Sequence, residues 1–500
     1  MNRNLQKTSN NTKNDNDTGL VEVTLAKELT AFDGLMIGVG GLIGGGIFSV
    51  VGLAVAKAGP AVIITFLLGG VVALTTGVSY VKLSRRYPLS GATYIYVDRA
   101  FQNRFLSGWV GWLLFSGYTI ICAMYAYSFG AYTAEFLIEL VYELELIRPL
   151  IQFGASTFLI FAFLGLNLRG VSESISVMRF IVLGKLIILG FFVIIGIIGI
   201  IGLPGLVVGK GLDNFSDFPL FLNIPGFIAV IIALTLIFPA FEGLELVPNC
   251  AEEMVDPEHN LGKAIYGSGI LVLIIYLSVV IVLVGNYAWT ELATNPSHAE
   301  VALATVASAI IGSVGVLLLS AGALFSTASA FNASLYGSSR LSYNLGSNRT
   351  FPSIFARLTT TTRVPGVSLV IISVVTFILT LTGNLEAISS MAAIAFLAVF
   401  LFVNVSALKL RKAGEIQINP IAPIISIALC GIAIVVLFWY YVFNAATQNL
   451  FLIIAVLAYY SFITVLNYVT LKESKKEKGN LFLFLKSKLR WGRKSAPTKK

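Results

Sequence analysis

Long apolar runs, separated by short charged or Pro- and Gly-containing stretches, extend over most of the chain. Many runs reach the roughly 20 residues that a helix needs to cross about 30 Å of hydrocarbon, whereas the weaker alternating pattern of a membrane barrel is absent. The pattern therefore predicts an all-α integral membrane protein with about twelve transmembrane helices. The predicted spans are 33–57, 61–84, 107–138, 150–168, 174–202, 225–250, 262–287, 301–341, 365–383, 386–408, 421–444 and 449–471.

Composition and charge give the orientation. The chain is 57% hydrophobic and 12% charged, with a mean hydropathy of +0.87. When the loops are assigned alternately to two sides, and the C-terminal tail is left out, 19 Lys and Arg residues fall on one side and 3 on the other. Because basic residues accumulate on the cytoplasmic side, both termini are predicted to be cytoplasmic and the number of spans even. We expect a multi-pass protein of the plasma membrane.

The two ends and the rarer residue types add little chemistry. Residues 1–30 form a polar N-terminal tail without a signal-peptide pattern, and the basic tail at 472–500 is suited to contact anionic headgroups rather than nucleic acid. Cys122, Cys250 and Cys430 lie in or beside apolar segments, and only two histidines are present. The sequence thus predicts neither a disulfide, a metal site nor a cofactor, and it leaves the oligomeric state open.

The first span contains the glycine-rich segment GVGGLIGGGIF, residues 38–48. Gly34, Gly38 and Gly41 have the spacing of small residues that pack against a neighbouring helix. Three consecutive glycines at 44–46 cover every face of a helix, so packing on one side does not explain them. They predict an unwound segment, with a second half-helix beginning at Ile47 and its free amide groups facing the bilayer midplane.

The sixth span contains a second candidate break, in FPAFEGLELVPN. Pro239, Glu242, Gly243 and Glu245 fall where the core of a helix is expected, although a simple proline kink is the alternative. Spans one and six occupy corresponding places if the first ten helices form two halves of five. Paired breaks of this kind indicate the midplane site of a transporter.

Several motifs resemble the amino acid, polyamine and organocation transporters. MIGVGGLIGGGIF is similar to the first-helix signature of that family, RRYPLSGATYIYVDRAF to its loop between helices two and three, and FPAFEGLELVPNCAEEMVDPEHNLGKAI to its sixth helix. ALFSTASAFNASLYGSSRLSYNLGSNRTFP is similar to its eighth helix, so the resemblance covers about residues 30–410. It implies a leucine-transporter-like 5+5 inverted repeat, with repeats at 31–202 and 225–410 and two accessory helices at 421–471.

The resemblance also implies a binding site for an amino acid. The substrate carboxylate would meet the amides of the glycine triplet, and the ammonium would meet free carbonyls at both breaks, an arrangement that suits a zwitterion. Gly45 stands where many members carry a hydroxyl, and Pro239 where an aromatic is common. The candidate substrate-binding residues are Leu42, Gly44, Gly45, Gly46, Pro239, Phe241, Glu242 and Gly243.

Lys185 lies inside the apolar run of the fifth span, with a snorkelling side chain as the alternative. Some family members carry a lysine at the matching position, where its ammonium resembles a substitute for a coupling sodium ion. The resemblance therefore favours proton coupling through Lys185, because an ammonium there would repel sodium. Glu245 is a second proton-coupling candidate, and the possible ion-site partners are Gly40, Gly41, Ser326 and Ser329.

These expectations describe a secondary transporter and not an enzyme. It would move amino acids in symport with protons by alternating access, without a nucleic-acid partner. Glu242 leaves a second possibility open, because its carboxylate would either select a cationic side chain or bond to a neighbouring hydroxyl. An amino acid or polyamine exchanger and a non-transporting amino-acid sensor remain alternatives.

Overall fold

The computed structural model describes residues 29–88, 92–170, 175–202, 212–218, 223–443 and 457–472. Within these ranges the chain is almost entirely helical. Nine helical stretches of the described residues are long and apolar enough to cross a membrane, where 46–86 and 224–249 each count as one stretch. Three helices, α1 (Ala31–Leu42), α13 (Ala302–Ile311) and α15 (Gly366–Thr380), are apolar but shorter. The all-helical membrane fold is confirmed, whereas the count of twelve spans and the division into repeats stay predictions. The expected tails lie outside the described residues, apart from 29–30 and 472.

Most predicted spans coincide with helices to within a few residues. Their bounds are α3 (Val62–Arg86), α5 (Arg104–Leu140), α6 (Arg148–Leu168), α7 (Ile175–Ile201), α10 (Pro257–Asn286), α15 (Gly366–Thr380), α16 (Leu385–Lys412) and α17 (Ile421–Phe443). Residues 457–472 are helical as well and overlap the expected span 449–471, ending one residue beyond it. Side-chain caps explain two of the starts: Asn103 and Asn384 accept backbone N–H groups from the first turns of α5 and α16.

The first span is broken where the glycine triplet predicts it. It consists of α1 (Ala31–Leu42) and α2 (Gly46–Ala58), so the second half begins one residue before the expected Ile47. A capping box starts α1: the Thr30 hydroxyl accepts the Asp33 N–H at 3.3 Å, and the Asp33 carboxylate accepts the Thr30 N–H at 3.0 Å. Asp33 also pairs with Arg179 of α7, which joins the first turn of α1 to that helix.

The sixth span is broken as well, and over a longer stretch. It consists of α8 (Ile224–Ile237), the 3₁₀ turn η5 (Phe238–Phe241) and α9 (Leu246–Asn249). Glu242 is extended, with φ −68° and ψ 145°, and Gly243 has φ +113°. A simple proline kink would keep the helix continuous on both sides, so this alternative is wrong.

Two expectations about helices are corrected. The expected span 301–341 is two helices, α13 (Ala302–Ile311) and α14 (Ser313–Ser347), because Gly312 between them has φ +64°, which ends a right-handed helix. The motif expected as a loop after the second span contains α4 (Ala92–Phe101). Short helices α11 (Trp289–Thr294) and α12 (Pro296–Glu300) precede α13.

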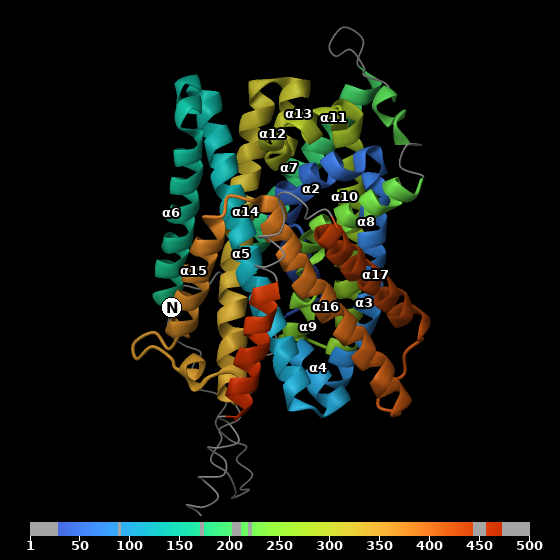
Figure 1. Ribbon diagram of the computed structural model, residues 1–500, viewed down its shortest axis with the longest axis vertical. Coiled ribbons are helices and arrows are strands. Elements are labelled where there is room, and N and C mark those ends of the chain that lie inside the picture. Colours follow the sequence, from blue (N-terminus) through green and yellow to red (C-terminus); the bar gives the residue numbers. More distant parts are fainter. Residues whose placement is uncertain are drawn as a thin grey trace, which may run out of the picture.

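The helices form a bundle around α5. Figure 1 shows α5 and α14 in contact along the long axis of the molecule, with α11, α12 and α13 gathered at one end and α4 at the other. The outer glycines of the first span pack as expected: a Cβ on Gly34 would lie 2.9 Å from the Cβ of Ala264, and one on Gly38 2.7 Å from that of Ser268. Small residues therefore let α1 approach α10 closely.

A buried polar cluster joins α3, α16 and α17. The Asn404 amide donates to Thr76 Oγ1 at 2.9 Å and to Ser426 Oγ at 3.0 Å, and its oxygen accepts the Ser79 hydroxyl at 2.7 Å. Thr76 and Ser426 are also hydrogen-bonded to each other at 2.7 Å. We call these four residues the Asn404 cluster. They are 0% exposed, and they are hydrogen-bonded to one another.

Candidate functional site

The two breaks pack directly on each other. A Cβ on Gly41 would lie 3.0 Å from the Cα of Gly243, and a Cβ on Gly46 would lie 3.1 Å from the backbone nitrogen of Ala240. Side chains larger than hydrogen do not fit at these backbone contacts. The N-terminus of α2, whose first N–H groups have no acceptor within the helix, thus lies beside the unwound part of the sixth span.

Side chains from neighbouring helices satisfy the carbonyls that the breaks release. The Ser326 hydroxyl of α14 donates to the carbonyl of Gly44 at 2.8 Å and lies 3.3 Å from that of Ile43. The Tyr276 hydroxyl of α10 contacts the carbonyl of Leu42 and lies 2.9 Å from that of Ala240. Two hydroxyl groups therefore serve carbonyls of residues 42–44 and one carbonyl of the second break.

One face of α5 carries tyrosines toward the breaks. Tyr118 donates to the Glu245 carboxylate at 3.0 Å, and Glu245 also accepts the Gly243 N–H at 3.0 Å. Tyr125, two turns further on, lies over the glycine triplet, since a Cβ on Gly44 would be 3.2 Å from its hydroxyl. The Glu242 carboxyl interacts with both Glu245 and Tyr125. The two acidic side chains are 3% and 1% exposed, so the second break holds a buried pair of carboxyl groups.

Lys185 is buried in α7, with 3% of its surface exposed. Val182, one turn before it, packs on Gly40 of α1, and Ile188, one turn after it, packs on Gly322 of α14. Residues at this spacing share one face of a helix, so Lys185 lies on the face that meets α1 and α14. A side chain that snorkels to the cytoplasmic surface would be more exposed.

The remaining predicted site residues take different positions. Phe241 directs its ring toward Phe66 and Tyr276, with ring centroids 6.2 and 5.4 Å away, and its backbone alone belongs to the break. Pro239 is buried and accepts the Glu242 N–H at 3.3 Å. Ser329 is half-buried on α14, and Ser326 of the same helix makes the hydrogen bonds to the first break.

The hydroxyl groups of Tyr118, Tyr125 and Tyr276 were not among the predicted site residues. The first two are seven residues apart, and Tyr132, seven residues further, donates to the carbonyl of Phe48 in α2 at 2.9 Å. This spacing of seven residues in the third span indicates that the three tyrosines lie on one face of the helix. Tyr276 lies ten residues after Tyr266 in its span, and nothing in the sequence indicates its partners.

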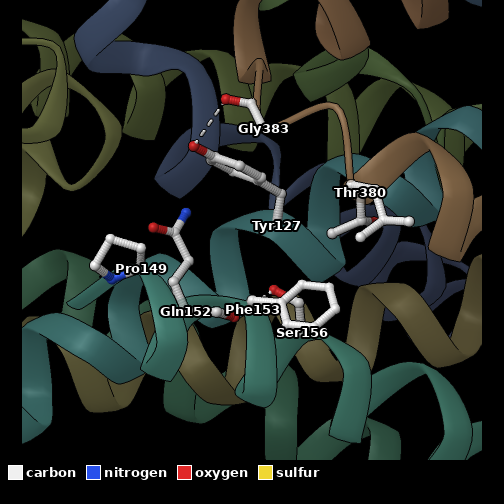
Figure 2. Close-up of a pocket in the computed structure, with 8 residues that line it drawn as sticks. Tyr127, Pro149, Gln152, Phe153, Ser156, Thr380 and Gly383 are labelled. Atoms are coloured by element: carbon white, nitrogen blue, oxygen red, sulfur yellow. Dashed lines mark hydrogen bonds between the residues drawn. The ribbon is translucent and has the colours of Figure 1, made fainter. Parts of the chain in front are cut away.

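A separate cavity of about 240 Å³ lies between α5, α6 and the end of α15, and no residue of the two breaks lines it. Figure 2 shows Tyr127 and Gln152 at this cavity, with the Tyr127 hydroxyl directed to the carbonyl of Gly383. The same hydroxyl donates to the Glu300 carboxylate of α12 at 2.9 Å. Burial raises the pKa of Glu300 above its ordinary value, although the Tyr127 hydroxyl and the Arg148 guanidinium act in the opposite direction.

This raised pKa predicts a pH-dependent effect of Glu300→Gln on stability. A carboxyl whose pKa is raised on folding stabilises the protein below its unfolded-state pKa, and this contribution is lost as the pH rises through the folded-state value. The glutamine keeps an acceptor for Tyr127 without the charge. We therefore expect the melting temperature of the variant, relative to the unmodified protein, to rise between pH 5 and pH 8. The exposed Glu143→Gln is the control, and a pH-independent difference would contradict the expectation.

Comparison of the sequence with known proteins identifies the family of this chain. The family model for amino acid permeases matches residues 29–463. The branched-chain amino acid permease BcaP of Bacillus subtilis (strain 168) is 24% identical over 437 residues, which cover 84% of this chain and 90% of the relative. The serine/threonine exchanger SteT of that bacterium is 26% identical over 417 residues, covering 81% and 89%.

A third relative, the methylthioribose transporter of Bacillus subtilis (strain 168), is 26% identical over 426 residues, which cover 81% of this chain and 87% of the relative. By their names, these three relatives are transporters and not enzymes, and their cargoes differ. The match of the family model covers both breaks and nearly all of the described helices. The chain therefore belongs to the amino acid permease family, as a multi-pass membrane protein whose relatives are named as transporters.

Proposed function

We propose that this protein carries amino acids across the plasma membrane in symport with protons, with both termini in the cytoplasm. The observation that carries the proposal is the contact between the two breaks, in which the amide end of α2 lies beside carbonyls of both segments that now accept the Tyr276 hydroxyl. Donors on one side and acceptors on the other match the carboxylate and ammonium of an amino acid. The glycine triplet would bind the carboxylate. The carbonyls at Leu42 and in the second break would bind the ammonium.

Alternating access follows if spans one, two, six and seven rock around this site against spans three, four, eight and nine. The two five-helix repeats are then 31–202 and 225–410, with helices 421–471 as accessories. Lys185 supports proton coupling, because it lies on the face of α7 that meets α1 and α14. The Ser326 hydroxyl already joins those two spans at the carbonyl of Gly44. An ammonium at this junction bridges the spans when protonated, and releases them when it loses its proton.

Uptake of labelled amino acids into proteoliposomes tests the proposal. The purified protein should accumulate at least one amino acid in response to an imposed pH gradient, inside alkaline, and not in response to a sodium gradient. Uptake that requires a trapped counter-substrate would establish the exchanger instead. Binding without any flux would favour a sensor.

The buried carboxyl pair supports a second candidate for the cargo, a cationic amino acid or amine. Glu242 and Glu245 lie beside the site, and a buried carboxylate is stabilised by a cationic partner. Glu242 lies nearer the glycine triplet, since it interacts with the tyrosine that covers Gly44. Glu245 is already held by Tyr118 and by the Gly243 N–H.

If Glu242 selects cationic cargo, Glu242→Gln should reduce Arg and Lys uptake by at least about tenfold and Ala and Leu uptake by less than about threefold. Only the cationic side chains lose a charge partner. Initial rates across a panel of labelled amino acids measure the difference, with Glu415→Gln, at a surface ion pair with Arg86, as the control. Equal losses for all substrates would make Glu242 a structural residue that bonds to Tyr125.

A further inference from the structure

Tyr276 joins the two breaks through a single hydroxyl group. It contacts the carbonyl of Leu42 in the first break and lies 2.9 Å from the carbonyl of Ala240 in the second. The side chain is 0% exposed, and its ring meets Phe66 and Phe241 edge-on, with centroids 5.7 and 5.4 Å away. The aromatic neighbours hold the ring, so the hydroxyl stays between the two carbonyls.

Both carbonyls need a donor because the chain is unwound. Leu42 ends α1 and Ala240 lies in the short turn η5, so neither oxygen has the partner that a continuous helix would supply. A carbonyl left without a donor inside a membrane protein is strongly unfavourable. The Ser326 hydroxyl donates to the carbonyl of Gly44 and lies 3.3 Å from that of Ile43, and the Tyr276 hydroxyl contacts the carbonyl of Leu42.

The ammonium group of an amino acid would use these same oxygens. This step rests on the proposed function, in which the ammonium binds near Leu42 and the second break. An ammonium has three N–H donors and can serve both carbonyls, whereas the phenol of Tyr276 has one proton to share between them. The tyrosine is therefore a weaker donor at the position where the loaded carrier holds the substrate.

We propose that Tyr276 is the positioning residue that lets the carrier return across the membrane without cargo. In a symport cycle the unloaded carrier must close its two breaks on each other, and it must do so with their carbonyls satisfied. Tyr276 supplies the donor for that step by keeping the carbonyls of Leu42 and Ala240 together. In an exchange cycle the carrier is loaded in both directions, so the substrate ammonium supplies the donor each time.

The variant Tyr276→Phe tests whether net uptake needs the hydroxyl and exchange does not, because it keeps the ring and removes the hydroxyl alone. Net uptake into vesicles without internal substrate should fall by at least about tenfold, equivalent to about 1.4 kcal/mol in the return barrier. Exchange of labelled external for unlabelled internal substrate should change by less than about threefold. A variant with para-aminophenylalanine at position 276, introduced by suppression of a stop codon, restores an N–H donor and should recover net uptake.

Tyr460→Phe is the matched control. The Tyr460 hydroxyl donates to a backbone carbonyl, that of Met391, at 3.2 Å, far in sequence from both breaks. It should leave the ratio of net uptake to exchange unchanged. Each variant is first checked for a single monodisperse peak and for its melting temperature in detergent.

Three results would overturn the inference: equal losses in the two modes, no loss in either, or exchange without net uptake in the unmodified protein. Failure of the proposed function looks different, because the unmodified protein would then show no amino acid flux in either mode. If Tyr276→Phe does not fold, the aminophenylalanine variant still tests the role of the donor. The proposal requires this variant to support net uptake at a rate close to that of the unmodified protein. A folded aminophenylalanine variant that only exchanges contradicts the role of the donor.

Discussion

Replacing Gly46 by leucine is expected to abolish amino acid binding while the helical bundle stays assembled. The new side chain would occupy the contact with Ala240, where a Cβ alone already comes within 3.1 Å of the backbone nitrogen. It also fills the space in front of the first amides of α2, where the substrate carboxylate would bind. We expect the affinity to fall by at least about 100-fold, because charge-assisted hydrogen bonds to those amides are lost.

Ligand-induced stabilisation in a thermal shift assay measures this effect, together with direct binding of the labelled substrate. Overpacking at a backbone contact costs about 1–3 kcal/mol, so the variant should also melt at a lower temperature. Gly190→Leu is the matched control, since a Cβ there meets nothing within 4 Å. Retained affinity in the Gly46 variant would mean that the glycines serve helix packing alone.

The second large effect is expected at Lys185. Lys185→Ala should remove accumulation driven by a pH gradient, because the variant has no ammonium to bridge and release α1 and α14. One pH unit provides about 1.4 kcal/mol, enough for about tenfold accumulation of a substrate that moves with one proton. The unmodified protein should approach this ratio, whereas the variant should stop at equal concentrations on both sides.

The measurement is the plateau of uptake at imposed pH steps of zero, one and two units. Lys263→Ala, an exposed lysine on α10, should accumulate substrate as the unmodified protein does. A Lys185 variant that still concentrates substrate in proportion to the step would exclude this residue as the coupling group. Glu245, held by Tyr118 and the Gly243 N–H, would then be the next residue to replace.

The two breaks could be predicted because the sequence violates a local rule there. Three consecutive glycines and an intramembrane Pro with two carboxyl groups are unfavourable inside a lipid-embedded helix unless they have a special role. The same reasoning failed at Gly312, where a single glycine between apolar residues looks like part of one continuous helix. Its positive φ is a property of the folded chain, and one glycine does not reveal it.

The partners at the site could not be predicted from the sequence. Tyr276 and Leu42 are 234 residues apart, and Ser326 and Gly44 are 282 apart. Which hydroxyl meets which carbonyl depends on how α10 and α14 pack around the breaks. Phe241 shows a related limit, because its ring packs on Phe66 of α3 and Tyr276 of α10, two contacts that the sequence does not indicate.

The Asn404 cluster has a mechanical consequence for the proposed alternating access. Moving α3 along its axis by one residue is a shift of about 1.5 Å, which would break the hydrogen bonds of Thr76 and Ser79 to Asn404 together. With no water in the bilayer core to replace them, such a slide is opposed, whereas a tilt about this point keeps the short hydrogen bonds intact. The cluster therefore acts as a pivot for α3, anchored to α16 and α17, so the swing of α3 is largest at its two ends.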